Sequence, residues 1–143
     1  MESYLSMINR QQELVNNFKG IGFAFSNKQF TEMCLKLGIK ENEAKEKLYS
    51  IGGGGYLLKS VAKDFYNIID NNNEELENAM KDSNFAYSMF NYELNNHEYV
   101  VTYSIDSTLD ALGLEYDEVK NNSILFEALE KAKKNQINNS CWN

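Results

Sequence analysis

The sequence has no proline, a single arginine (Arg10), a single histidine (His97) and two cysteines. With one arginine, the chain has almost no guanidinium groups for forked contacts with phosphate. Cys34 and Cys141 are too few for a disulfide framework in a chain of 143 residues, so we predict two reduced thiols and a cytoplasmic protein. The missing proline, the preference for lysine over arginine and the many asparagines together indicate an AT-rich bacterial source.

Long apolar runs are also missing. No stretch approaches the roughly 20 apolar residues that a membrane-spanning helix needs, and the first 19 residues are polar and amphipathic, without a signal-peptide core. The formal net charge of −7 disfavours phosphate backbones and anionic membranes, which attract clustered Lys and Arg. We expect no direct nucleic-acid binding and no membrane binding, and an acidic surface that suits solubility or a basic partner.

Apolar residues are nevertheless plentiful, at 43% of the chain, with 13% aromatics. This composition is not that of a disordered protein, and the length is sufficient for a core that buries about two thirds of the unfolded surface. We predict one globular domain over residues 1–134 and a flexible tail over residues 135–143.

Hydrophobic periodicity predicts an α+β fold that is mainly helical, with a small antiparallel β element. The expected helices cover residues 2–19, 27–37, 41–47, 61–71, 74 onward, 85–95, 106–112 and 117–134. Asn71 to Asn73 are expected to break the helical pattern between the fourth and fifth of these. Residues 48–51, 56–59 and 99–105 are expected as strands, and residues 21–25 as either a strand or a buried connector.

Four consecutive glycines, Gly52, Gly53, Gly54 and Gly55, are the strongest local signal. Glycine enters positive-φ conformations freely, so the run predicts a tight hairpin turn between two short strands. No structural role obviously needs four glycines in succession, and we therefore interpret this stretch as a recognition surface. The candidate binding residues around it are Tyr49, Ser50, Gly52, Gly53, Gly54, Gly55, Tyr56 and Lys59.

A phosphate-binding loop is a poor match to this stretch, because its glycines would have to lead into a helix with Lys and Ser/Thr directly after them. Lys59 and Ser60 follow Gly55 by four and five residues instead. The exposed N–H groups of such a turn can still cradle an anion, so a nucleotide or another anion remains the alternative ligand.

A second candidate group consists of Glu93, His97 and Tyr99. If the helix continues that far, Glu93 and His97 share a face, and such a pair can relay a proton or contribute to a metal site. Two ligands do not make a metal site, so we expect no metal and no cofactor and interpret His97 as paired with Glu93. A Cys34–His97 dyad would be catalytic, but the apolar helical context of Cys34 favours a buried structural thiol. We therefore predict no enzymatic activity.

Aromatic residues recur between the predicted helix at 85–95 and residue 103, as Tyr87, Phe90, Tyr92, Tyr99 and Tyr103. Stacking of nucleic-acid bases would also require a positive groove, whereas the local charge is negative. The run therefore favours core packing, and any tyrosine left exposed would suit a protein interface.

Several of these stretches resemble a family of small accessory proteins carried by phages, plasmids and conjugative elements of Firmicutes and gut bacteria. The similar segments are residues 23–30, 49–51 with the glycines, 92–99 and 110–114, within roughly residues 21–132. The resemblance brings no catalytic residues. It implies a mobile-element protein of a kind that often antagonises host defence, such as an anti-CRISPR or anti-restriction factor.

The expected function is therefore that of a small acidic, non-enzymatic binding protein that docks on a host or phage protein and inhibits a defence system. The alternative is a small-ligand binder that holds a nucleotide or another anion at the glycine turn. The identity of the partner and the oligomeric state are left open by the sequence.

Overall fold

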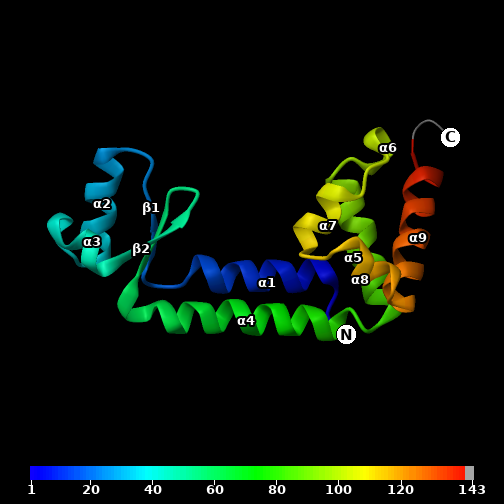
Figure 1. The fold of residues 1–143 in the computed structure, drawn as a ribbon, viewed down its shortest axis with the longest axis horizontal. Helices are drawn as coiled ribbons and strands as arrows, with labels where there is room; N and C mark the ends of the chain where they lie inside the picture. Colours follow the sequence, from blue (N-terminus) through cyan, green and yellow to red (C-terminus); the bar gives the residue numbers. More distant parts are fainter. Residues whose placement is uncertain (141–143) are drawn as a thin grey trace. The chain divides into compact units, whose positions relative to one another are not determined.

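The computed structural model describes residues 1–140 and shows a mainly helical protein with one small antiparallel sheet (Figure 1). In chain order the elements are α1 (Tyr4–Asn16), β1 (Ile21–Phe23), α2 (Asn27–Leu37), η1 (Glu41–Glu43), α3 (Ala44–Lys47), β2 (Leu48–Gly52), β3 (Gly55–Leu58), η2 (Lys59–Val61), α4 (Ala62–Ala79), α5 (Ser83–Asn96), α6 (Tyr99–Thr102), α7 (Asp106–Leu112), α8 (Tyr116–Lys120) and α9 (Ser123–Asn138). The predicted α+β class is confirmed.

The contacts of the chain divide it into two compact units. We call them the helical unit (Met1–Asn9 and Asn73–Asn143) and the hairpin unit (Arg10–Asn72). The sequence had predicted one globular domain over residues 1–134. The boundaries between the units fall inside helices α1 and α4.

Side-chain caps set where several helices begin. Ser26 Oγ accepts the N–H of Gln29 at the start of α2. Asp82 and Asn122 cap α5 and α9 by accepting the N–H groups of Phe85 and Leu125. Each cap satisfies a backbone donor that the helix leaves free.

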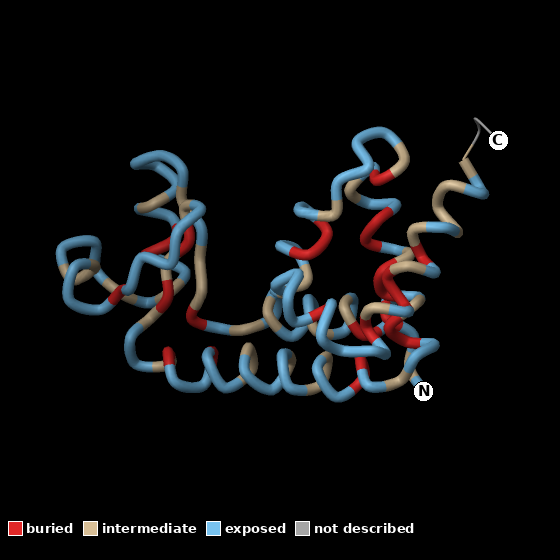
Figure 2. The backbone as a smooth tube through the Cα atoms, turned by 45° about the vertical axis from the view of Figure 1, so that its right-hand side comes forward, coloured by how far each residue is buried: buried red, intermediate tan, exposed pale blue. Residues whose placement is uncertain are grey.

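One core fills the helical unit, and α5 and α9 pack together in it. Buried residues are concentrated on these two helices (Figure 2). The apolar side chains that are fully buried here are Ala86, Met89, Phe90, Leu94, Val119, Leu129 and Ala132. Their helical spacing agrees with the apolar stripes read from the sequence.

The hairpin unit has smaller cores on the two faces of its sheet, whose strand order is β1-β3-β2. On one face Met33, Cys34 and Leu48 form a buried cluster, which the partly buried Tyr56 and Leu58 join. On the other face Leu57, Ala62 and Phe65 form the second cluster, with Val15, Phe18, Ile21 and Ile69 around it. Alternate residues of β3 therefore serve different cores, as the pleat requires.

Two predictions about secondary structure in the middle of the chain were wrong. Residues 99–105 do not form a strand; Tyr99–Thr102 form the short helix α6, because Tyr99 is buried in the helical core and its segment pairs with no strand. The third strand is β1 instead. Residues 71–73 do not end a helix, since α4 runs unbroken from Ala62 to Ala79; asparagine is a weak helix former, not a breaker.

The C-terminal helix α9 extends to Asn138, so residues 135–138 continue a helix where the sequence predicted a tail. Cys141, predicted to be a reduced thiol in that tail, lies outside the described residues. Within residues 1–140, no helix is both long enough and apolar enough to span a membrane.

Candidate functional site

The glycine run forms the turn of a β-hairpin, as predicted. Strands β2 and β3 pair antiparallel, with Tyr49 opposite Leu57 and Ser50 opposite Tyr56. Gly53 and Gly54, between the strands, have φ of +57° and +76°. Positive φ at both central residues is the conformation that two-residue hairpins favour and that residues other than glycine, Asn and Asp rarely adopt.

The two flanking glycines also have structural roles. Gly52 has φ of +84° and lies at a shift of the β2–β3 register that leaves Ile51 without a partner, which is the pattern of a β-bulge. A Cβ on Gly55 would lie 2.9 Å from Cγ1 of Ile51. The argument that four glycines in succession imply recognition is therefore wrong: the turn, the bulge and close packing account for them.

Recognition is better supported by what surrounds the turn. Strand β1 pairs with β3 and places Phe23 opposite Gly55. Phe25 follows, and a Cβ on Gly54 would lie 2.5 Å from Cε1 of its ring. The N–H of Ala24 donates to the carbonyl oxygen of Gly54 at 2.9 Å, so the segment that carries both phenylalanines is tied to the glycine turn.

These residues form an exposed apolar surface, which we call the hairpin face: Phe23, Phe25, Tyr49 and Ile51. Their exposed fractions are 58%, 75%, 46% and 36%. Among the described residues, Phe23 and Phe25 are the two phenylalanines that are exposed. The register puts Phe23 and Tyr49 on the sheet face that bears the buried Leu57, beyond the part that the second cluster covers.

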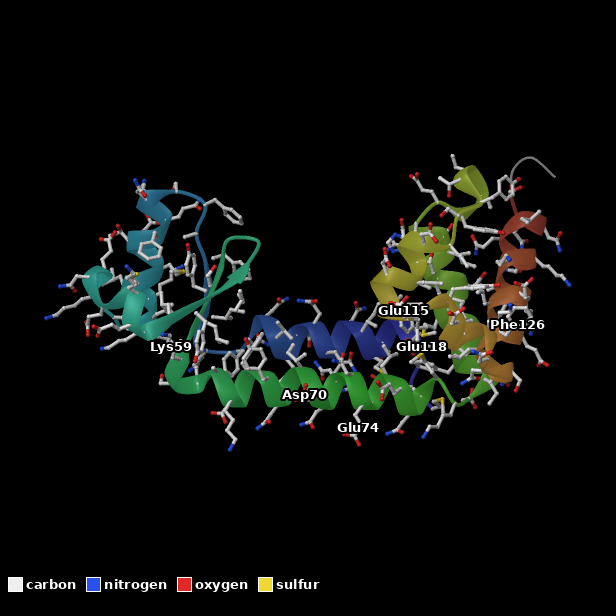
Figure 3. The ribbon with its side chains drawn as sticks, in the orientation of Figure 1. Lys59, Asp70, Glu74, Glu115, Glu118 and Phe126 are labelled. Atoms are coloured by element: carbon white, nitrogen blue, oxygen red, sulfur yellow. The ribbon has the colours of Figure 1, made fainter. Side chains whose placement is uncertain are left out.

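The two segments that supply the hairpin face contain no charged residue. Residues 20–27 and 48–58, which supply the hairpin face, contain no Asp, Glu, Lys or Arg in a chain of net charge −7. Lys59 follows directly, at the foot of the hairpin (Figure 3), and its Nζ lies 5.0 Å from the centre of the Tyr49 ring. This cation–π contact orients the tyrosine from one side.

The remaining predicted residues, Glu93, His97 and Tyr99, belong to the helical unit. His97 Nε2 lies 3.3 Å from Glu93 Oε2, and Tyr4 OH donates to Glu93 Oε1 at 2.9 Å. Glu93 is 6% exposed, so Tyr4 and His97 replace the hydrogen bonds that water would otherwise donate to its two carboxylate oxygens. Burial, together with the charge of Glu93 and the hydrogen bond to it, raises the pKa of Tyr4.

This buried group ties α1 to α5. The spacing of four residues between Glu93 and His97 predicted that these two side chains pair. Tyr4 is 89 residues from Glu93 in the sequence, and no local pattern predicted that contact. Tyr99 is buried in the same core. Within residues 1–140, no three potential ligands among His, Cys, Asp and Glu come together to hold a metal.

Cys34 lies in the hairpin unit, packed with Met33 and Leu48, and is 2% exposed. Burial and, secondarily, the charge of Glu41 raise the pKa of its thiol. A raised pKa disfavours the thiolate that nucleophilic catalysis needs. The surroundings of Cys34 are those of a packed structural thiol.

A family model matches residues 3–135 of the chain, in both units. The chain belongs to the family of unknown function DUF7659. The match spans the hairpin and the buried Tyr4–Glu93–His97 group, but it assigns no residue a role. No curated protein matches the chain, and no solved structure matches it.

Proposed function

We propose that this DUF7659 protein is a non-enzymatic binding protein that docks on another protein through the hairpin face. The exposed, uncharged cluster of Phe23, Phe25, Tyr49 and Ile51 is the observation that carries the proposal. Interface centres are enriched in aromatic residues and depleted of charge. An exposed tyrosine can hydrogen-bond water through its hydroxyl group, but phenylalanine has no polar group that could do so. The exposure of Phe23 and Phe25 is therefore better explained by contact with a partner.

The rest of the surface defines the partner further. The net charge of −7 steers the protein towards a positively charged surface, and complementary charge at the rim of an interface raises the association rate. The partner we propose therefore carries an apolar patch bordered by Lys and Arg. We propose a bacterial cytoplasmic protein, and the resemblance to mobile-element accessory proteins makes components of a CRISPR or restriction system the first partners to test.

The alternative of a nucleotide or another anion at the glycine turn has less support. The glycines lead into strand β3 and not into a helix, so no helix N-terminus adds its positive end to the turn. The positive φ angles are accounted for by the turn and the bulge, and Lys59 is already placed over Tyr49.

The experiment compares two tyrosines of equal exposure in the same unit. Tyr49 is 46% exposed on the hairpin face, and Tyr66, on α4, is 48% exposed. A photo-crosslinking amino acid at position 49 should join the protein to a purified defence-system component, whereas the same amino acid at position 66 should not. Tyr49→Ser should weaken a measured Kd by about tenfold or more, as expected for an aromatic interface anchor, and Tyr66→Ser should leave it unchanged.

Two further variants test the phenylalanines. Phe23→Ser should abolish binding in the same assay, and Leu35→Ser, which changes an apolar residue of α2 that is 81% exposed, should not. Thermal melts of all four variants establish that they are folded. Equal losses at the hairpin face and at the control positions, or binding that survives both Phe23→Ser and Tyr49→Ser, would contradict the proposal.

A further inference from the structure

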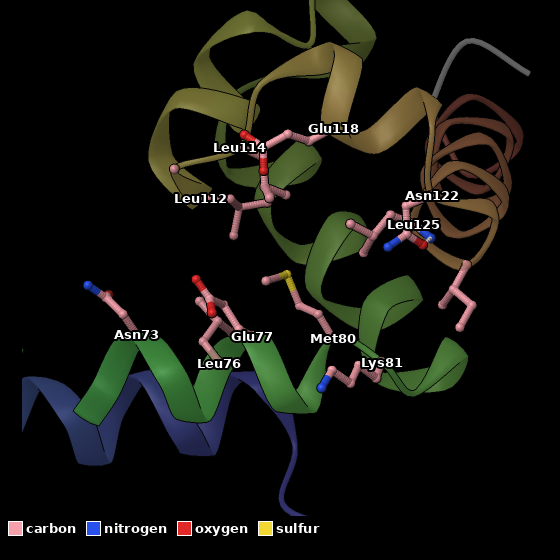
Figure 4. Close-up of a pocket in the computed structure, with 12 residues that line it drawn as sticks. Asn73, Leu76, Glu77, Met80, Lys81, Leu112, Leu114, Glu118, Asn122 and Leu125 are labelled. Carbon is pink, nitrogen blue, oxygen red and sulfur yellow. Dashed lines mark hydrogen bonds between the residues drawn. The ribbon is translucent and has the colours of Figure 1, made fainter. Parts of the chain in front are cut away.

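The helical unit contains a cavity of about 420 Å³ that the hairpin face does not include. It lies between the C-terminal half of α4, the connection from α7 to α8, and the start of α9 (Figure 4). All its lining residues fall within Asn73–Leu125, so it belongs to one compact unit. Its volume is in the range of small-molecule sites, roughly 300–1,000 Å³.

The floor of the cavity is apolar. Leu76 and Met80 contribute from the end of α4, where the N–H of Met80 donates to the carbonyl of Leu76 at 2.9 Å and keeps them one turn apart. Leu125 completes the floor, and Leu112 and Leu114 lie on the facing side of the cavity (Figure 4). Met80 and Leu125 are 8% and 6% exposed, so the floor is the outer layer of the helical core and can hold the hydrocarbon part of a ligand.

The charged lining residues are two glutamates and one lysine. Glu77 rises from α4, and Glu118 lies on the opposite side, on α8 (Figures 3 and 4). Glu77 and Glu118 are both exposed residues. Within residues 1–140 the Glu77 carboxylate has neither a hydrogen bond nor an ion pair. Glu118 uses one oxygen to accept the N–H of Glu115 at 3.3 Å, and Lys81 Nζ donates to Asn78 Oδ1 at 3.3 Å.

From this lining we propose that the cavity binds a small organic ammonium ion, an amine with an alkyl or arylalkyl body. The hydrocarbon covers the floor, and the ammonium group donates to the carboxylates of Glu77 and Glu118. Hydrogen bonds between charged groups are stronger than neutral ones. The two glutamates outnumber Lys81, so a carboxylate or phosphate ligand would meet net repulsion. The proposal does not depend on the function proposed for the hairpin face.

Three probes of similar size and different charge test this inference: 2-phenylethylammonium, 2-phenylethanol and 3-phenylpropanoate. The measurement is an NMR titration of the full chain that follows the Met80 methyl group and the backbone amides of residues 112–114. The ammonium ion should shift these signals saturably and bind about two- to fivefold more tightly than the alcohol, which is what ion pairs with exposed carboxylates contribute. The carboxylate should give no saturable shift.

Glu77→Gln and Glu118→Gln should each reduce the preference for the ammonium ion over the alcohol, and the double variant should abolish it. Glu115 and Glu118 form a capping box at the start of α8. Glutamine also serves at this position of a capping box, so Glu118→Gln retains the start of the helix. The matched control is Glu127→Gln, which lies on the exposed surface of α9 and outside the cavity lining. It should leave the preference for the ammonium ion over the alcohol unchanged.

Equal binding of the carboxylate, full preference for the ammonium ion in the double variant, or saturable shifts confined to residues away from the cavity would each overturn the proposal. The absence of any saturable shift in the unmodified protein into the millimolar range would do so as well. An unchanged preference for the ammonium ion in Glu127→Gln separates an effect at the cavity from a general effect of losing one negative charge.

Discussion

The helical unit and the hairpin unit use their apolar residues differently. In the helical unit no described phenylalanine is exposed, and one continuous core joins α1, α5, α7, α8 and α9. In the hairpin unit two small clusters share a three-stranded sheet, and Phe23 and Phe25 remain on the surface. Burying a phenylalanine is favourable by roughly 1.5–3 kcal/mol. The exposed Phe23 and Phe25 therefore do not contribute this free energy to the hairpin unit, whereas the buried Phe85 and Phe90 contribute it to the helical unit.

Polar interactions differ between the units in the same way. The helical unit buries a carboxylate, that of Glu93, and supplies it with Tyr4 and His97. In the hairpin unit, Glu43 of η1 and Lys47 of α3 form an ion pair at the surface. A buried charge left without a partner is costly, whereas an exposed pair contributes little. The buried Tyr4–Glu93–His97 group therefore helps to specify the fold of the helical unit, whereas the Glu43–Lys47 pair contributes little to the fold of the hairpin unit.

The largest expected effect comes from the core of the helical unit. Phe90→Ala, at a side chain with 0% exposure, should lower the free energy of unfolding by about 3–5 kcal/mol, because it leaves a cavity among packed residues. Phe25→Ala makes the same chemical change at a side chain with 75% exposure and should cost less than about 1 kcal/mol. Urea denaturation followed by circular dichroism measures both. Similar losses in the free energy of unfolding for the two variants would contradict the conclusion that Phe90 is buried in the helical unit and Phe25 is exposed in the hairpin unit.

The buried hydroxyl gives the next effect. Tyr4→Phe removes the donor that lies 2.9 Å from Glu93 Oε1 and should cost about 1–3 kcal/mol near pH 7, since the carboxylate loses a buried partner. Tyr66→Phe, at an exposed ring, is the control and should leave the unfolding midpoint unchanged.

The same pair of variants has a pH signature. Burial, the charge of Glu93 and the hydrogen bond to it raise the pKa of Tyr4 in the folded protein, so the fold retains a proton that the unfolded chain releases above about pH 10. The stability that Tyr4 contributes is thus fully present below pH 10 and is lost as the pH rises further. The gap between wild type and Tyr4→Phe should narrow from pH 8 to pH 11. A constant gap would rule out a perturbed Tyr4.

The hairpin turn should give a smaller effect that depends on the residue introduced. Gly53 has φ of +57° and open space around its Cα, so conformation alone decides the cost there. Gly53→Val should cost about 2 kcal/mol, because left-handed backbone disfavours β-branched residues most. Gly53→Asn should be nearly neutral, since asparagine is common in such turns. Thermal melts distinguish the two; equal destabilisation would mean that the turn is not of this type.

The exposed ion pair should give the smallest effect. Hydrogen bonds from Lys47 and from the backbone N–H of Lys40 lower the pKa of Glu43. The contribution of Glu43 to stability is thus present above its unfolded pKa and is lost as the pH falls through the folded one. Lys47→Gln should return the Glu43 pKa towards its ordinary value in a ¹³C NMR titration, and Lys45→Gln should not. An unchanged Glu43 pKa in Lys47→Gln would contradict the contact.

Residues 48–58 and 99–105 show how far local patterns reach. Both stretches were expected to contain strands, although six of the seven residues in 99–105 are β-branched or aromatic and only three of the eleven in 48–58 are. Gly53 and Gly54 fold the first stretch onto itself and supply a partner strand within the same segment. The second has no such turn, and burial of Tyr99 holds it as helix α6 between two positive-φ residues, Glu98 and Tyr103. Strand propensity takes effect where a partner strand is available.

The candidate sites were predictable to different degrees. Tyr49, the glycines and Lys59 were selected as candidates because the glycine run marks the hairpin. Phe23 and Phe25 were not selected as binding residues, although their alternation beside Gly22 is the signal that could have indicated an edge strand. The cavity lined by Glu77 and Glu118 could not be found, because the residues that form it come from helices brought together only in the folded unit.

The sequence by itself determined the features that depend on backbone chemistry within a few residues. These are the hairpin at the glycines, the Ser26 cap, the helix end at Gly38 and the i,i+4 pair of Glu93 and His97. Tertiary structure alone decided which aromatic rings are left exposed, that Tyr4 satisfies Glu93, and that α4 continues through its asparagines. Burial and long-range hydrogen bonds decide these outcomes, and their free energies exceed the small local propensities that a sequence displays.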